Sequence, residues 1–194
     1  MSLAFRMMYS VGLTPWDHGM VPPELVELVS GLTPGRALDV GCGTGTQALW
    51  LAGQGWEVTG IDVVGKAIAK ARERAAEQGA RATFLAVDAA ASDLDLGAPF
   101  QLIVDYGCLH SVPDSTREGI TRTYARHAAP GATLIVFGFA PRRGPGPKGA
   151  GRDELERRLG EDWTLVATKT DHSTPAPKAF VKSGRPIWYV WQRR

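Results

Sequence analysis

Cysteine is scarce in this sequence, and long apolar runs are missing. The 194 residues include two cysteines, Cys42 and Cys108, and no cysteine or histidine pair has the spacing of a zinc site. We therefore expect two reduced thiols and no metal ion. No apolar run is long enough to span a bilayer, and the first residues lack the pattern of a secretion signal. The sequence thus predicts a soluble, cytoplasmic protein with no membrane partner.

Neither sign of charge is in large excess. The 22 basic and 20 acidic side chains give a net charge of +2 at pH 7, so nothing indicates a nucleic-acid partner. The pattern Gly-x-x-x-x-Gly-Lys-Ser/Thr is also missing, which excludes a Walker-type phosphate site. The length and an apolar content of 44% suit an ordinary globular core, and we predict a single domain over residues 1–194.

A glycine-rich turn between a predicted strand and a predicted helix is the most informative feature that is present. Residues 36–40 predict a buried strand, Gly41, Gly43 and Gly45 follow it, and an apolar helical pattern begins at once. This order lets a backbone approach a nucleotide-type ligand closely. Asp62 closes the next strand, about 20 residues after the first glycine, where an acid commonly holds ribose hydroxyls.

Two further residues distinguish between kinds of nucleotide. Thr46 stands where a dinucleotide fingerprint has Gly or Ala. Asp39 comes two residues before the first glycine, where its charge repels a pyrophosphate and attracts the ammonium of an amino acid. Asp39 favours a ligand with a cationic end, and both residues disfavour a nicotinamide dehydrogenase, which stays an alternative.

Several ordered segments resemble the motifs of one enzyme family. Leu38–Gly45 resembles the first motif of the class I S-adenosylmethionine-dependent methyltransferases. Later segments resemble that family's remaining strands in the same order: Val58–Asp62, Phe84–Ala89, Phe100–Asp105 and Pro130–Val136. Before them, Thr14–Asp17 and Pro22-Pro23 resemble the small-molecule branch with thiopurine, thiol, halide and tellurite methyltransferases. The resemblance implies S-adenosylmethionine as cofactor and methyl transfer to a sulfur, oxygen, nitrogen or chalcogen atom of a small-molecule acceptor.

Predicted strands and helices alternate along the chain. We expect strands over about 36–40, 56–62, 82–88, 100–106, 132–139, 163–170 and 187–191, and helices over about 23–32, 46–53, 65–78, 115–128 and 153–159. Ser115–Glu118 has capping-box spacing. The order predicts an α/β fold: a Rossmann-like, doubly wound, mostly parallel seven-stranded sheet with an antiparallel last strand. Residues 140–151 predict a mobile loop, and the resemblance implies that residues 1–22 form a lid.

The resemblance also assigns cofactor-binding positions. They are Trp16, Asp39, Gly41, Cys42, Gly43, Gly45, Asp62, Val63, Asp88, Ala89, Asp105 and Tyr106. Asp39 is expected near the methionyl ammonium. In the alternative interpretation, its carboxylate instead accepts hydrogen bonds from nearby backbone amides. Asp62 is expected at the ribose. Asp88 is expected at the adenine, with a turn cap as its alternative. Trp16 either faces the sulfonium by cation–π attraction or anchors the N-terminal arm.

His110 and Tyr106 are the candidate catalytic residues because they follow the fourth predicted strand. His110 can accept a proton near neutral pH, or it packs in the loop. Tyr106 lines the pocket, binds the cofactor's amino-acid end, or packs. The segment lacks Asn/Asp-Pro-Pro-Tyr/Phe and Pro-Cys, which argues against base methylation. A protein that binds S-adenosylmethionine without transfer and an RNA methyltransferase remain alternatives. The sequence specifies neither the acceptor nor the oligomeric state.

Overall fold

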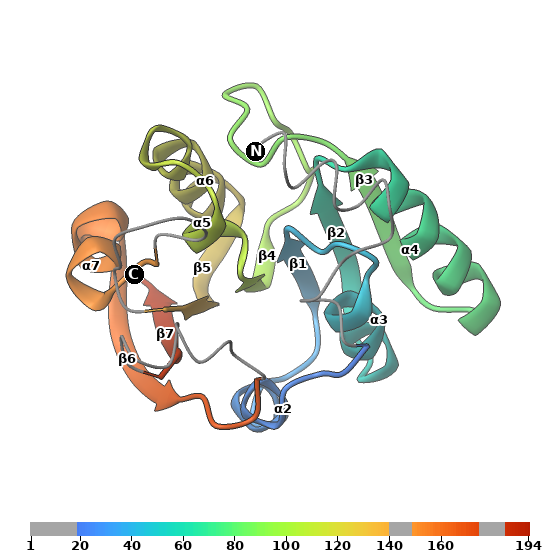
Figure 1. Cartoon of the computed structure of the whole chain (residues 1–194), viewed down its shortest axis with the longest axis horizontal. Coiled ribbons are helices and arrows are strands. Elements are labelled where there is room, and N and C mark those ends of the chain that lie inside the picture. Colours follow the sequence, from blue (N-terminus) through green and yellow to red (C-terminus); the bar gives the residue numbers. More distant parts are fainter. Residues whose placement is uncertain (1–18, 140–148, 175–184) are drawn as a thin grey trace.

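The computed structural model describes residues 19–139, 149–174 and 185–194. A seven-stranded sheet lies at its centre, with strand order β3-β2-β1-β4-β5-β7-β6 (Figure 1). Trp16 with most of the expected lid, and residues 140–148 of the expected loop, lie outside the described residues. Within the described ranges, no helix combines the length and apolar character that crossing a bilayer requires.

The sheet is parallel except for one strand. Its members are β1 (Arg36–Val40), β2 (Glu57–Asp62), β3 (Ala82–Ala86), β4 (Phe100–Tyr106), β5 (Ala128–Gly138), β6 (Trp163–Thr170) and β7 (Ile187–Arg193). β7 runs antiparallel to both β5 and β6, while β1 to β5 pair in parallel. This arrangement confirms the predicted fold class. It also brings the start of β7 beside the carboxyl end of β5, which in turn pairs with β4.

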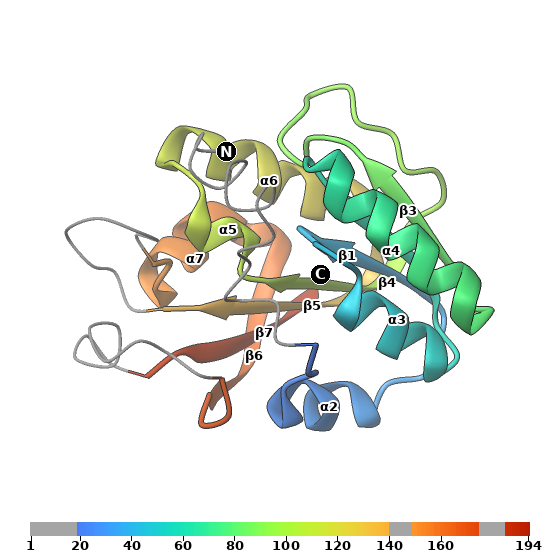
Figure 2. The same cartoon turned by 45° about the vertical axis from the view of Figure 1, so that its right-hand side comes forward.

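Helices cover both faces of the sheet (Figures 1 and 2). They are α2 (Pro23–Ser30), α3 (Thr46–Gly53), α4 (Gly65–Gln78), α5 (Cys108–Ser111), α6 (Asp114–His127) and α7 (Arg152–Leu159), followed by the 3-10 turn η1 (Gly160–Asp162). Apolar side chains of α2, α3 and α4 form one core cluster, and those of α5, α6 and α7 form the other. Trp188 and Trp191 of β7 enter opposite clusters, as the period of a strand predicts.

A helix end is predicted correctly where a single residue determines the local backbone conformation. α4 ends at Gly79, which has a left-handed φ of 59° as a C-terminal stop requires. The capping-box prediction is wrong: α6 begins at Asp114 after Pro113 and has no side-chain cap. The Glu118 carboxylate pairs instead with Arg122 and Arg158.

Candidate functional site

The turn after β1 is held by the chain's own contacts. Gly41, Gly43 and Gly45 have left-handed φ values of 73°, 55° and 84°. A Cβ on Gly41 would lie 2.6 Å from the Cβ of Cys108, and one on Gly45 would lie 2.9 Å from the Phe84 ring. Packing therefore already requires glycine at two of the three positions. The result is a fixed turn whose backbone lies close to the end of β4.

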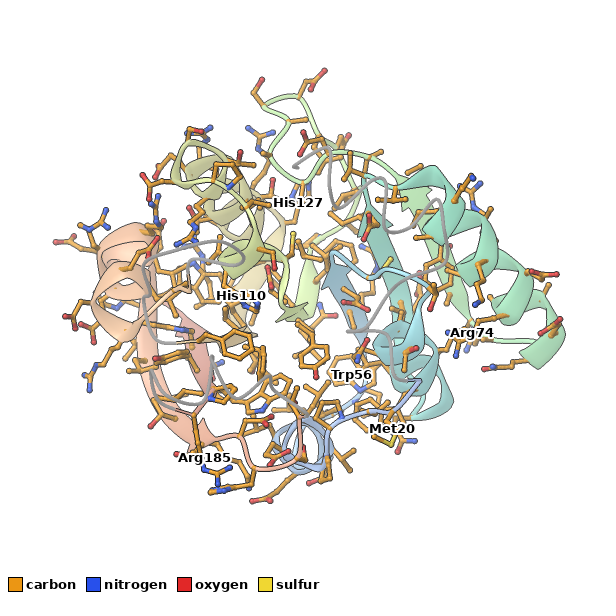
Figure 3. All side chains as sticks on the ribbon, in the orientation of Figure 1. Met20, Trp56, Arg74, His110, His127 and Arg185 are labelled. Carbon is orange, nitrogen blue, oxygen red and sulfur yellow. The ribbon has the colours of Figure 1, made fainter. Side chains whose placement is uncertain are left out.

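Arg74 of α4 braces the same turn from the side. Its Nη1 donates to the Thr44 carbonyl at 2.9 Å and to the Thr44 and Thr46 hydroxyls at 3.1 and 3.2 Å. Figure 3 shows Arg74 projecting from α4. Sequence reasoning missed this residue because its partners lie about 30 residues away and no local pattern joins them. The guanidinium fixes both the turn and the first residue of α3.

Asp39 contributes a buried carboxylate oxygen without a hydrogen bond. The residue is 1% exposed, and Oδ2 has no partner among the residues that the structure describes. Burial, and after it the neighbouring Asp105 and Asp62 carboxylates, raise the pKa of Asp39 to about 8 against the Ala48 amide, which lowers it. A buried unpaired carboxylate is costly, so a cation at Oδ2 would satisfy it.

Asp62 lies at the end of β2 and faces the turn. Its Oδ2 accepts from the Gly43 amide at 3.1 Å, and its Oδ1 accepts from the Val64 amide at 2.8 Å. Burial raises the pKa of Asp62, while amides of Val64, Gly43 and Val63 lower it. The Val63 side chain is 44% exposed, which leaves an apolar surface beside the acid.

Asp88 and Ala89 follow β3 on the same edge. The Asp88 carboxylate accepts from the Ala90 amide at 2.9 Å, which is the turn-cap contact of the alternative reading. The Asp88 side chain is nevertheless exposed. The Ala89 carbonyl accepts from the Thr123 hydroxyl at 2.7 Å and is thereby tied to α6.

Asp105, at the end of β4, is surrounded by internal donors. The Gly107, Cys108 and Leu109 amides donate to it at 3.1, 2.8 and 3.1 Å, and the Tyr124 hydroxyl donates to Oδ2. Burial raises its pKa to about 6, against these hydrogen bonds. These contacts brace the turn into α5. A direct cofactor contact by Asp105 stays a prediction.

His110 is held in one tautomer. Its Nδ1 lies 3.1 Å from the Phe137 carbonyl, which can only accept, so Nδ1 carries the hydrogen and Nε2 keeps a lone pair. The residue is 5% exposed, and burial lowers its pKa to about 4; the Phe137 carbonyl opposes this shift and Arg117 adds to it. His110, which belongs to α5 and is labelled in Figure 3, is therefore a neutral imidazole at physiological pH.

Five rings gather where β4, β5 and β7 meet, and we call them the aromatic wall: Tyr106, His110, Phe137, Phe139 and Trp188. Tyr106 and Trp188 stack with planes 2° apart and centroids at 5.3 Å. Phe137 contacts both, at 4.8 and 4.9 Å, and Phe139 meets His110 edge-on at 4.8 Å. The wall borders the same sheet edge as the glycine turn.

The strand order, the glycine turn and the acid at the end of β2 define the class of protein. They are the architecture of a methyltransferase built on a doubly wound sheet with its ligand at the carboxyl edge. A family model described as a methyltransferase domain matches residues 37–131. The chain is also similar to the 2-heptyl-1-hydroxyquinolin-4(1H)-one methyltransferase of Mycobacteroides abscessus, with 34% identity over 156 residues, 78% of this chain and 69% of that protein. The chain belongs to the class I S-adenosylmethionine-dependent methyltransferases.

Other relatives match shorter stretches or the fold alone. Thiocyanate methyltransferase 1 of Arabidopsis thaliana is 44% identical over 63 residues, 31% of this chain and 28% of that protein. A structure from work on the conversion of a disulfide bond into a thioacetal group during echinomycin biosynthesis has a TM-score of 0.79 and 25% identity over 98% of this chain and 92% of that chain. The N-methyltransferase NodS of Bradyrhizobium japonicum, solved with S-adenosylhomocysteine, shares the fold at a TM-score of 0.71 and 21% identity, over 88% of this chain and 84% of that one.

S-adenosylmethionine is the cofactor of this enzyme, and the described residues fit it. The unpaired Asp39 oxygen suits an ammonium, and the Asp62 carboxylate at the turn suits hydroxyl donors. Among the described residues, no three His, Cys, Asp or Glu side chains gather as a metal site.

Proposed function

We propose that this chain transfers a methyl group from S-adenosylmethionine to a sulfur, oxygen, nitrogen or chalcogen atom of a small-molecule acceptor. One observation carries the cofactor assignment: the buried Asp39 Oδ2 beside the glycine turn has no partner within the described ranges. An amino-acid ammonium supplies the charge that this oxygen needs. A nicotinamide dinucleotide brings a pyrophosphate to the turn instead, so the same oxygen argues against a dehydrogenase.

The other cofactor contacts follow from the order of the strands. The backbone of Gly41, Cys42, Gly43 and Gly45 would lie along the cofactor. Asp62 would hold the ribose, and Val63, Asp88 and Ala89 would border the adenine. Because the Asp62 side chain also accepts from the Gly43 amide, ribose binding and the shape of the turn depend on one carboxylate. Trp16 remains the proposed neighbour of the sulfonium.

The acceptor that we favour is a planar heteroaromatic molecule. The aromatic wall offers the partly exposed rings of Tyr106 and Phe139, backed by the buried ring of Phe137, and rings of this kind pack well against flat π-systems. The name of the Mycobacteroides abscessus relative specifies a hydroxyquinolinone, which is a molecule of this shape. Thiols and anionic acceptors are the second class, because the Arabidopsis thaliana relative is named for thiocyanate.

The protein's task is alignment and removal of a proton. The bound cofactor supplies a methyl group on a positively charged sulfur, and the residues must hold the acceptor atom in line with it. Nε2 of His110 accepts a hydrogen bond and so orients a hydroxyl or thiol. Because its pKa is about 4, this imidazole is neutral at neutral pH and offers that lone pair to the acceptor. His110 therefore directs the acceptor in our account.

We also propose that residues 1–194 act as one domain, with residues 1–22 closing over the cofactor, in the cytoplasm and without nucleic acid. The net charge of +2 supports this view, because an RNA-binding enzyme normally carries a basic surface. A chain that binds the cofactor without turnover is the competing reading.

Calorimetric titration and an acceptor screen test the proposal together. The enzyme is titrated with S-adenosylmethionine and S-adenosylhomocysteine. It is then incubated with methyl-labelled cofactor and 2-heptyl-1-hydroxyquinolin-4(1H)-one, 8-hydroxyquinoline, thiophenol or thiocyanate. We expect binding of both cofactor forms and label in at least one acceptor. Binding with no label in any acceptor favours the non-catalytic reading, and absence of binding refutes the cofactor site.

A further inference from the structure

Tyr106 of the aromatic wall begins a hydrogen-bonded series of three side chains that leads away from the acceptor side. The Tyr106 hydroxyl, at the end of β4, lies 3.1 Å from Oγ1 of Thr174. Oγ1 of Thr174 in turn lies 3.0 Å from Oδ2 of Asp171, which is 1% exposed. Asp171 and Thr174 follow β6, and sequence reasoning selected neither. The series joins the proposed reaction site to a buried carboxylate.

The partners of Asp171 fix the direction of the series. Oδ2 also accepts from the Trp188 indole at 2.8 Å, and Oδ1 accepts from the Thr174 amide at 2.8 Å. All three of these hydrogen bonds donate to oxygens of the Asp171 carboxyl. The Thr174 hydroxyl must therefore donate to Asp171, which leaves its oxygen to accept from Tyr106. Each hydrogen points from the sheet edge toward Asp171.

A second carboxylate anchors this segment. Glu24 of α2, 6% exposed, accepts from the His172 amide at 2.8 Å and from the Ser173 hydroxyl. Burial raises the pKa of Glu24, but these hydrogen bonds together outweigh it and lower the pKa. Burial, Asp171 and Glu24 raise the pKa of the Tyr106 phenol, which Thr174 lowers. Tyr106 thus stays protonated at neutral pH and has a proton to pass on.

We propose that Tyr106, Thr174 and Asp171 form a proton relay for the methyl transfer, an inference that rests on the proposed function. The acceptor's X–H bond breaks and its proton forms a bond to the Tyr106 oxygen. The Tyr106 proton moves to Thr174, and the Thr174 proton moves to Oδ2 of Asp171, which becomes a neutral carboxylic acid. The electron pair of the X–H bond stays on X for attack at the methyl carbon. Tyr106 is the catalytic residue, and Thr174 and Asp171 act through it.

Thr174 offers the cleanest variants because valine removes the hydroxyl at nearly constant shape and serine keeps it. We compare the unmodified chain, Thr174→Val, Thr174→Ser, Tyr106→Phe and Asp171→Asn, using the fastest-methylated acceptor of the panel above whose own pKa exceeds 7, so that it still carries its proton at pH 7. Asp171→Asn also disturbs the Trp188 contact. The two threonine variants therefore decide the question if the asparagine variant does not fold. Calorimetry with S-adenosylhomocysteine shows which variants keep the cofactor site.

At pH 7 we expect Thr174→Val to lower kcat at least tenfold, with an unchanged KM for S-adenosylmethionine, and Thr174→Ser to stay within threefold of the unmodified chain. The loss should shrink below twofold when the pH exceeds the acceptor's own pKa, because the acceptor then arrives without its proton. A structural defect does not recover in this way. The double variant Tyr106→Phe/Thr174→Val should be no slower than Tyr106→Phe.

Two results overturn the relay alone: Thr174→Val as fast as Thr174→Ser at pH 7, or a loss that persists at high pH. Either leaves the proposed function standing, because the unmodified chain still transfers methyl. If the unmodified chain methylates no acceptor, the proposed function fails, and the relay fails with it.

Discussion

Protonation of Asp39 should control how tightly the enzyme binds its cofactor. Burial, together with repulsion from Asp105 and Asp62, raises the pKa of this carboxyl to about 8. Only the ionised form attracts an ammonium, so binding below pH 8 must release a proton. Affinity then falls about tenfold for each pH unit well below the pKa, and by about 50-fold in total from pH 8 to pH 6. This corresponds to about 2.3 kcal/mol of binding free energy.

Calorimetry in two buffers of different ionisation enthalpy measures the protons released on binding. Near pH 6.5 we expect close to one proton per S-adenosylmethionine or S-adenosylhomocysteine, because both carry the same ammonium. The isosteric Asp39→Asn variant should bind more weakly at pH 8 and show a much smaller pH dependence. An affinity that is equal at pH 6 and pH 8, or an unchanged slope in Asp39→Asn, would refute the role given to this carboxylate.

Further predictions concern stability and the catalytic edge. The pKa of Asp39 is about 8 in the folded protein and 3.8 as its ordinary value, so ionisation of Asp39 destabilises the unliganded fold increasingly as the pH rises from 4 to 8. Asp39→Asn removes this effect, and scanning calorimetry should show a rise in Tm that grows from pH 4 to pH 8. Glu154→Gln should lower the free energy of unfolding in urea by about 3 kcal/mol, because the buried Arg117 guanidinium loses its counter-charge. That guanidinium lies 2.8 Å from a Glu154 carboxylate oxygen, and an unchanged urea midpoint would contradict this prediction. Gly41→Ala should destabilise the fold by at least about 2 kcal/mol, whereas Gly31→Ala, with open space around it, should change stability by less than about 1 kcal/mol.

Local sequence signals predicted the parts of the fold that depend on nearby residues. The strand at Arg36–Val40, the glycines after it and the stop at Gly79 follow from periodicity and from backbone conformations that favour glycine. The short helix α5 was not predicted, because four residues are too few to show a helical period. The capping-box prediction is wrong because the helix begins directly after Pro113 and the Glu118 carboxylate pairs with arginine side chains.

The details of the site depend on contacts between distant segments, which a single sequence does not display. The hydrogen bond from Tyr106 to Thr174 joins residues 68 apart, and that from the Ser173 hydroxyl to Glu24 joins residues 149 apart. The sequence placed Asp39 near a cationic ligand, but only the fold reveals that one of its oxygens lacks a partner among the described residues. Burial likewise makes His110 a weaker base than its residue type suggested.

Mass spectrometry of a single reaction tests the central claim most directly. The enzyme is mixed with S-adenosylmethionine carrying a trideuterated methyl group and with 2-heptyl-1-hydroxyquinolin-4(1H)-one, 8-hydroxyquinoline and thiophenol in one tube. Our account predicts one acceptor heavier by a trideuteromethyl group and an equal amount of S-adenosylhomocysteine. Unlabelled acceptors beside intact cofactor, from protein that binds S-adenosylhomocysteine in calorimetry, would contradict it.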